Sequence, residues 1–150
     1  MACVNPTRTF LGDQSQWLTL QLELDDVQGL WGGRRIAITG TRQVVVQLVQ
    51  PEMLERRYEF ELPIAAWTHL IEVFIAQDFV TIQPVERPGI PDEARPLITL
   101  TNAAKEQRSV AKWARIKDER FDAVYQALLQ IEKLVAPLAP MFQGPYKAVG

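Results

Sequence analysis

Two adjacent carboxylates, Asp92 and Glu93, stand in the proline-rich stretch VERPGIPDEARP, residues 85–96. Paired carboxylates can perform acid–base chemistry when different environments separate their pKa values. Neighbours in an extended segment point to opposite sides, and Arg87 and Arg95 are near enough in sequence to neutralise both acids. Because the prolines also fix φ, the stretch predicts a stiff crossing with local ion pairs, which would equally suit a preformed edge for a partner.

Residues for other catalytic or metal chemistry are scarce. His69 is the only histidine and lies off the apolar stripe of its helix, so we expect an exposed residue and exclude triads and two-imidazole metal sites. Cys3 is the only cysteine, which excludes an intramolecular disulfide and a multi-cysteine metal site. Asp25 and Asp26 lack the spacing of an EF-hand loop and predict a turn instead. We therefore expect no cofactor and no enzyme, since no nucleophile, base and orienting group can be named together.

The glycine-rich stretch GLWGGRR, residues 29–35, places Trp31 beside Arg34 and Arg35. It leads into a strand and not into a helix N-terminus, so it is no phosphate-binding loop. Tryptophan and arginine dominate many protein interfaces, which makes Trp31, Arg34 and Arg35 candidate partner contacts together with Asp92 and Glu93. The alternative is that Trp31 folds over the sheet edge as part of the core.

Basic residues gather between positions 105 and 120, among them Arg108, Lys112 and Arg115. These three form a candidate anion-binding set. Alternation instead favours a solvated strand face carrying Arg108 and Lys112, with Trp113 on the packed inner face.

Composition narrows the class of protein but not its activity. The chain has 150 residues, 47% of them hydrophobic and 23% charged, which is typical of one globular domain. A formal net charge of -2 provides no field for nucleic acid or an anionic membrane, so we expect neither as a partner. The N-terminal stretch lacks a continuous apolar run, and we expect a cytoplasmic location.

Alternating patterns in the first part of the chain predict a four-strand antiparallel meander. Their residues are QWLTLQLEL at 16–24, RRIAIT at 34–39, VVVQLVQ at 44–50 and ERRYEFEL at 55–62.

Pro63 then begins a helix whose apolar stripe comprises Ile64, Trp67, Ile71, Phe74 and Ile75. A later hairpin turns around NAAKEQ, and Asp118 caps a second amphipathic helix. Glu132 falls within the apolar stripe of this helix, and a basic residue of the hairpin is a candidate partner for its carboxylate. The expected fold is α+β, an antiparallel sheet with two helices on one face, in a single domain with loosely held ends at 1–15 and 137–150.

The order of elements resembles that of the emfourin-like small bacterial proteins and related uncharacterised domains. The likeness rests on four short segments: QGLWGGRRIAI, AQDF, IPDEARPLITLT and ERFDAVYQALLQI. Studied members inhibit thermolysin-like metallopeptidases, so the resemblance implies a binding protein and not an enzyme. This chain departs from the family plan at Trp31 and Gly32 and in an extra region around residues 44–60.

The leading hypothesis from the sequence is a non-enzymatic, cytoplasmic, protein-binding domain. Alternatives are an inhibitor of a metallopeptidase, and a small-ligand or anion-binding domain or enzyme with a pocket between sheet and helices.

Overall fold

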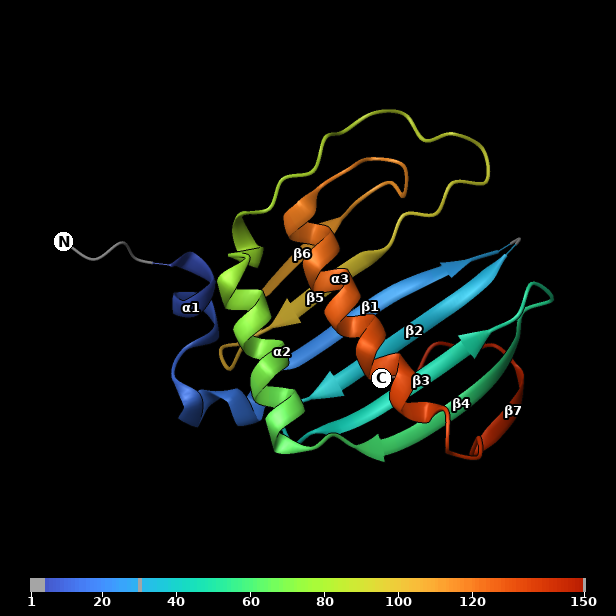
Figure 1. Ribbon diagram of the computed structural model, residues 1–150, viewed down its shortest axis with the longest axis horizontal. Coiled ribbons are helices and arrows are strands. Elements are labelled where there is room, and N and C mark those ends of the chain that lie inside the picture. Colours follow the sequence, from blue (N-terminus) through green and yellow to red (C-terminus); the bar gives the residue numbers. More distant parts are fainter. Residues whose placement is uncertain (1–4, 30, 150) are drawn as a thin grey trace.

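A computed structural model describes residues 5–29 and 31–149, and its centre is an antiparallel sheet of seven strands (Figure 1). The strands lie in the order β6-β5-β1-β2-β3-β4-β7, and each neighbouring pair is antiparallel. Their bounds are β1 Gln21–Gln28, β2 Gly32–Thr39, β3 Gln43–Val49, β4 Leu54–Glu61, β5 Leu97–Thr101, β6 Gln107–Ala111 and β7 Phe142–Pro145. The predicted meander is β1 to β4, and the later hairpin, β5–β6, extends it by pairing β5 with β1.

Two long helices, α2 (Ile64–Ala76) and α3 (Glu119–Glu132), cover one face of the sheet (Figure 1). Helix α3 begins where the Asp118 side chain accepts the backbone N–H of Phe121 at 2.9 Å. Phe74 and Leu128 are 0% and 1% exposed, so each helix seals its apolar stripe against the strands. The predicted α+β class and antiparallel sheet are confirmed.

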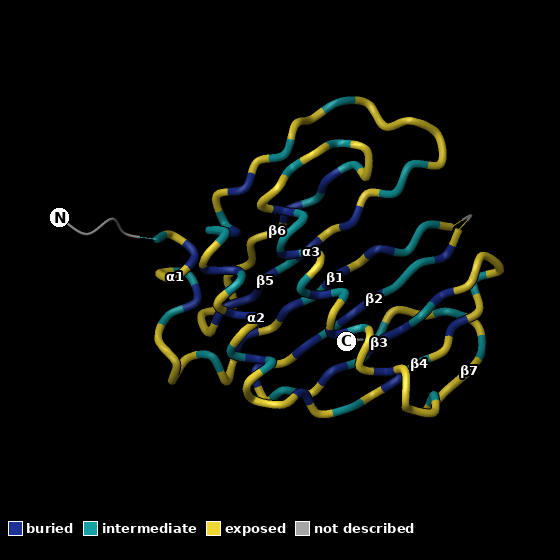
Figure 2. The backbone as a smooth tube through the Cα atoms, in the orientation of Figure 1, coloured by how far each residue is buried: buried dark blue, intermediate teal, exposed yellow. Residues whose placement is uncertain are grey.

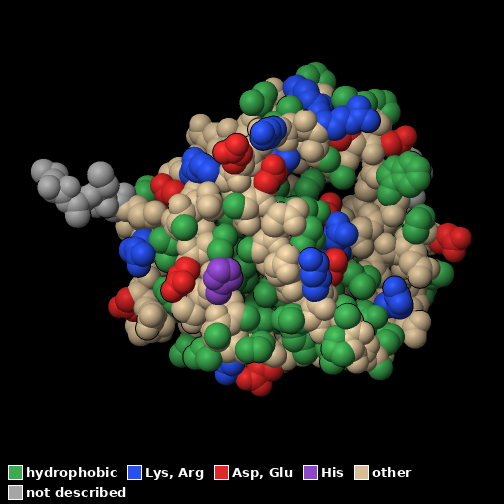
Figure 3. All heavy atoms as spheres, viewed as in Figure 1, with side chains coloured by type: hydrophobic (Ala, Val, Ile, Leu, Met, Phe, Trp, Pro, Cys, Tyr) green, Lys and Arg blue, Asp and Glu red, His purple; other side chains and the backbone are tan. Residues whose placement is uncertain are grey.

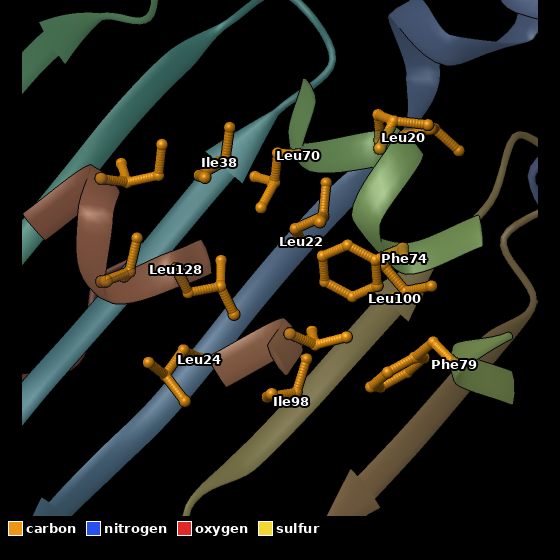
Figure 4. Close-up of a cluster of buried hydrophobic side chains, with 14 of the residues drawn as sticks. Leu20, Leu22, Leu24, Ile38, Leu70, Phe74, Phe79, Ile98, Leu100 and Leu128 are labelled. Carbon is orange, nitrogen blue, oxygen red and sulfur yellow. The ribbon is translucent and has the colours of Figure 1, made fainter. Parts of the chain in front are cut away.

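The core lies between these helices and the inward side chains of the strands (Figures 2 and 4). Cross-strand register aligns the apolar positions, as in the pairs Leu24 with Ile36 and Leu22 with Ile38. The Phe74 ring also meets the Phe79 ring edge-on, with centroids 5.1 Å apart. Phe79 belongs to a short 3₁₀ helix, Phe79–Thr81.

The start of the first strand differs from the prediction. Residues Gln14–Thr19 form a 3₁₀ helix, whose N-cap Asp13 and Gln16 make a capping box, and Leu18 is 65% exposed. Strand β1 starts later and continues to Gln28, so the predicted turn at Asp25 and Asp26 is wrong. Ile64 is likewise exposed, because it stands on the first turn of α2 beyond the edge of the core.

Both ends of the described chain, which were expected to be loosely held, lie against the rest of the molecule. Helix α1 (Pro6–Leu11) buries Leu11, and the Thr7 backbone N–H and hydroxyl donate to Asp78 at 3.0 and 2.8 Å. Near the other end, β7 pairs with β4 and places residues 146–149 against the sheet. Long-range polar contacts hold both ends, and such contacts leave no periodic signal in the sequence. Cys3 lies outside the described residues.

Candidate binding cleft

A cleft of about 620 Å³ opens between the β1–β2 hairpin, the proline-rich segment, the segment 112–117 after β6, and helix α3. Figure 3 shows this face of the molecule, hollowed at the upper right with lysine and arginine side chains around the hollow. Among the residues predicted to form a site, the cleft brings together Trp31, Arg34, Asp92, Lys112 and Arg115. They come from segments that are far apart in the sequence.

The β1–β2 hairpin presents Trp31 at the mouth of the cleft. Gly32 and Gly33 have φ of 73° and 138°, and a Cβ on Gly33 would lie 1.9 Å from the Asp26 carbonyl oxygen. The two glycines therefore allow the chain to turn tightly after Trp31, whose side chain is 62% exposed. Of the two interpretations left open by the sequence, the structure favours the exposed tryptophan.

Arg34 points to the helix side of the sheet and fastens the hairpin to α3. Its guanidinium donates to Asp26 at 2.8 Å, to Glu132 at 2.7 Å and to the Tyr125 hydroxyl at 3.1 Å. Burial opposes the charge of Arg34, but the hydrogen bonds to Glu132 and Asp26 outweigh it and raise the pKa of Arg34. All three partners of the Arg34 guanidinium therefore belong to this chain. One of them, Glu132, had a basic residue of the later hairpin as its candidate partner in the sequence.

Tyr125 completes this network by donating its hydroxyl hydrogen to Asp26. Burial, followed by the adjacent Asp26 carboxylate, raises the pKa of Tyr125 well above its ordinary value. Near neutral pH the phenol is therefore a hydrogen-bond donor on the cleft wall and not a base.

Arg35 follows Arg34 in β2 and so points to the opposite face of the sheet. It is 6% exposed and donates to Glu23 there. The structure therefore does not bring Arg35 together with Trp31.

The proline-rich segment forms one wall of the cleft through Asp92, Ala94 and Pro96, and Glu93 holds this wall in place. The Glu93 side chain is 2% exposed and accepts from the Arg87 guanidinium at 2.7 Å and from the Arg115 backbone N–H at 2.8 Å. The hydrogen bond from Arg87 comes first among the causes that lower the pKa of Glu93 to about 2. Asp92 is exposed and lines the cleft, while Arg95 pairs with Glu86 rather than with Asp92.

Trp113 supports the same wall from below. A Cβ on Gly89 would lie 2.4 Å from the Trp113 ring, so the segment packs directly on it. The guanidinium carbons of Arg95 and Arg87 lie 5.0 and 6.0 Å from the ring centroid. These contacts, with the Glu93 ion pair, explain how a segment without regular structure keeps one position.

The three residues of the predicted anion-binding set, Arg108, Lys112 and Arg115, lie in different surroundings. Lys112 is 5% exposed, donates to the Ile116 carbonyl and forms an ion pair with Asp122 at 3.1 Å. The predicted solvated face is therefore wrong for Lys112, because the pairing of Ile98 with Val110 turns that side of β6 toward the helices. Arg108 is exposed but lies over the Phe10 ring, outside the cleft, whereas Arg115 lines it.

Of the residues predicted to form a site, Trp31, Asp92 and Arg115 are exposed on the rim, where Lys117 and Gln126 are exposed as well. The floor consists of cations and carboxylates that already pair with one another. Such an arrangement can bury an apolar group against the indole and pair charged groups at either side. His69 is exposed on α2 and does not line the cleft.

Within residues 5–29 and 31–149, no group of three or more histidine, cysteine or carboxylate side chains could hold a metal ion. In the same part of the chain, no helix combines the length and the apolar character needed to cross a membrane.

Sequence reasoning missed Asp26 and Tyr125 as cleft residues. Asp26 was taken for part of a turn, and Tyr125 for an ordinary member of an apolar stripe. The one available signal was Glu132, a carboxylate inside that stripe, which indicated a buried cation nearby without identifying Arg34.

Comparison of the sequence with protein-family models and with curated proteins finds no match to either. The resemblance to the emfourin-like proteins stays a prediction.

Proposed function

We propose that the protein is a binding module whose cleft receives a segment of another protein, with Trp31 as the main contact. The observation that carries this proposal is the 62% exposure of Trp31 at the mouth of a cleft of about 620 Å³. Leaving a large indole in water is unfavourable, and tryptophan is among the residues that most often dominate protein interfaces. A partner that covers Trp31 would recover that free energy.

The rim is organised for contact before any partner arrives. Glu93 fixes the backbone of Arg115 at 2.8 Å, while the Arg115 guanidinium makes no hydrogen bond or ion pair to the residues that the structure describes. The backbone of the rim therefore loses little conformational entropy when a partner binds. The free guanidinium favours a partner that carries an acidic group beside its apolar one.

The paired floor supports binding rather than catalysis. Arg34 and Lys112 each face a carboxylate, and Tyr125 holds its proton, so the floor of the cleft supplies no free base near neutral pH, and the exposed Asp92 carboxylate lies on the rim. We place this binding function in the cytoplasm, in keeping with the absence of cysteine pairs from the sequence.

The test compares two exposed apolar residues at opposite ends of the molecule. Trp31→Ala should lose the partners that wild type recovers from lysate, whereas Leu18→Ala, which changes a residue 65% exposed, should keep them. Circular dichroism checks that both variants stay folded. Retention of every partner by Trp31→Ala would contradict the proposal.

The same variants address the inhibitor hypothesis that follows from the family resemblance. Titration of wild type into a thermolysin-type assay should lower turnover if the partner is such a peptidase, and Trp31→Ala should restore it. Unchanged peptidase turnover at an excess of the wild-type protein would exclude thermolysin-type peptidases as partners. The proposal of a binding module would then be tested by the lysate capture experiment alone.

A further inference from the structure

The outer face of the sheet, opposite the helices, carries a second set of buried polar side chains. Arg35, Gln47 and Glu55 are 6%, 0% and 1% exposed. They lie next to one another across β2, β3 and β4, since Arg35 pairs with Gln47 and Val49 with Glu55. Residues 146–149 cover them, crossing behind β4 and β3 (Figure 1).

Every hydrogen bond between this polar set and residues 146–149 goes to a backbone group. Glu55 accepts the N–H of Lys147 at 3.0 Å, and Gln47 donates to the Lys147 carbonyl at 2.7 Å. Two residues on, Gln47 accepts the Val149 N–H at 3.2 Å, and Arg35 donates to the Val149 carbonyl. Contacts at alternate residues are those that an extended segment offers.

The polar set is held ready by contacts within the sheet. Glu55 also accepts from Arg57 at 2.8 Å and from Gln47 at 2.9 Å, and Arg35 donates to Glu23. A buried amide such as that of Gln47 is costly when it lacks partners, so a segment that covers Gln47 must supply backbone groups to it, as residues 146–149 do. Because no side chain of residues 146–149 takes part in these bonds, they do not specify which extended segment lies there.

Charge narrows the choice of segment. The outer face also carries Glu23, Asp25 and Glu59, and Arg35 and Arg57, which pair with Glu23 and Glu55, only partly balance the acidic residues. Burial, and then the charge of Asp25, raises the pKa of Tyr146, which places that ring in acidic surroundings. Lys147 is the one charged residue of the covering segment. A basic segment therefore suits this face.

The same face continues beyond the covered area. A hollow of about 210 Å³ lies over β5, β1, β2 and β3, with Glu23, Ala37 and Thr99 among its lining residues. Glu23 joins the two areas, because it both lines the hollow and binds Arg35. A segment longer than residues 146–149 has a path across the sheet.

We propose that the outer face of β2–β4 is a binding site for an extended, basic segment of a partner protein, and that residues 146–149 occupy it in cis. The site is separate from the cleft, since the sheet lies between them, and it does not depend on Trp31. A partner segment can bind only to molecules in which residues 146–149 have left the site, so its apparent affinity falls in proportion to the fraction of such molecules. A change that weakens the contacts of residues 146–149 with the sheet should therefore strengthen the binding of the partner segment.

Lys147→Pro tests this in the full chain. Proline lacks the N–H that Glu55 accepts, while Gln47, Glu55 and Arg35 remain intact. Lys147→Ala is the matched control, because it removes the same side chain and keeps the N–H. The probe is a synthetic peptide with the sequence of residues 144–149, GPYKAV, and the readout is the NMR shifts of the backbone amides of β3, which all the variants retain.

Loss of one hydrogen bond corresponds to about fivefold, so the peptide should bind Lys147→Pro about fivefold more tightly than Lys147→Ala. Adding Gln47→Leu to Lys147→Pro should abolish binding, and a peptide with Glu in place of Lys should bind less well. Trp31→Ala should leave all of this unchanged, which separates the result from the function proposed for the cleft.

No binding by a folded Lys147→Pro variant, or binding that survives Gln47→Leu, would overturn the proposal. A wild-type chain that is dimeric by sedimentation, and monomeric in Lys147→Pro, would overturn it in favour of exchange of residues 146–149 between two copies.

Discussion

Helices α2 and α3 pack on the same face of the sheet but are held by different forces. The inward side of α2 is apolar throughout, with Trp67, Leu70 and Phe74 at 4%, 1% and 0% exposure. Helix α3 adds ion pairs to its apolar stripe, from Glu132 to Arg34 and from Asp122 to Lys112. The cleft lies along α3, where apolar packing gives way to these pairs.

The difference shows why only one helix borders a candidate site. Apolar burial is non-directional and fills space, so the α2 side closes over the sheet. Half-buried ion pairs require set distances and angles, and the desolvation of their charges offsets much of their attraction. They hold α3 at a distance from the β1–β2 hairpin and leave a polar-walled opening between them.

The largest expected effect is on the apolar side. Phe74→Ala should lower the free energy of unfolding by about 3–5 kcal/mol, because it opens a cavity in a fully buried place. Ile64→Ala, on the exposed first turn of the same helix, should change it by less than about 0.5 kcal/mol. Urea unfolding followed by circular dichroism measures both. Equal effects would show that α2 does not depend on its inward face.

The next effect concerns the ion-paired side. Arg34→Leu should lower the free energy of unfolding by about 2 kcal/mol, because Asp26 and Glu132 lose their cation. This value lies below the range for a fully buried ion pair, since Arg34 is partly exposed. Arg42→Leu, which breaks an exposed pair with Glu61, should cost less than about 1 kcal/mol. The same urea titration compares them. If both variants lose equally little, the network is not what fastens α3 to the hairpin.

The smallest effect should be present near neutral pH and lost in acid. The folded-state pKa of Glu93 is lowered to about 2, below its ordinary value of about 4.3, so its ionised form stabilises the folded state at higher pH. This contribution is complete above about pH 4.3 and is lost as the pH falls toward 2. Wild type should exceed Glu93→Gln in melting temperature at pH 6, and the gap should close in acid. A gap that stays constant with pH would contradict the assigned role of the Glu93 carboxylate.

Much of the fold could be predicted, whereas the site could be predicted only in part. Alternation identified the meander through pairs such as Leu24 with Ile36, and the 3.6-residue stripe identified Phe74 and Leu128. Trp31, predicted as a partner contact, and Arg115, predicted as an anion contact, both line the cleft, and their binding roles stay predictions. Arg35 was grouped with Trp31 because the two are close in sequence, yet strand alternation sends it to the other face of the sheet.

The sequence by itself determined which residues are apolar at which period, and this decides the α+β class and the face that each helix buries, because the hydrophobic effect depends on pattern and not on particular partners. Only the tertiary structure decided that Arg34 meets Asp26 and Glu132, that Lys112 is buried, and that residues 146–149 lie on Gln47. Hydrogen bonds and ion pairs act over a few ångströms between residues as much as 114 positions apart, so no local pattern predicts them.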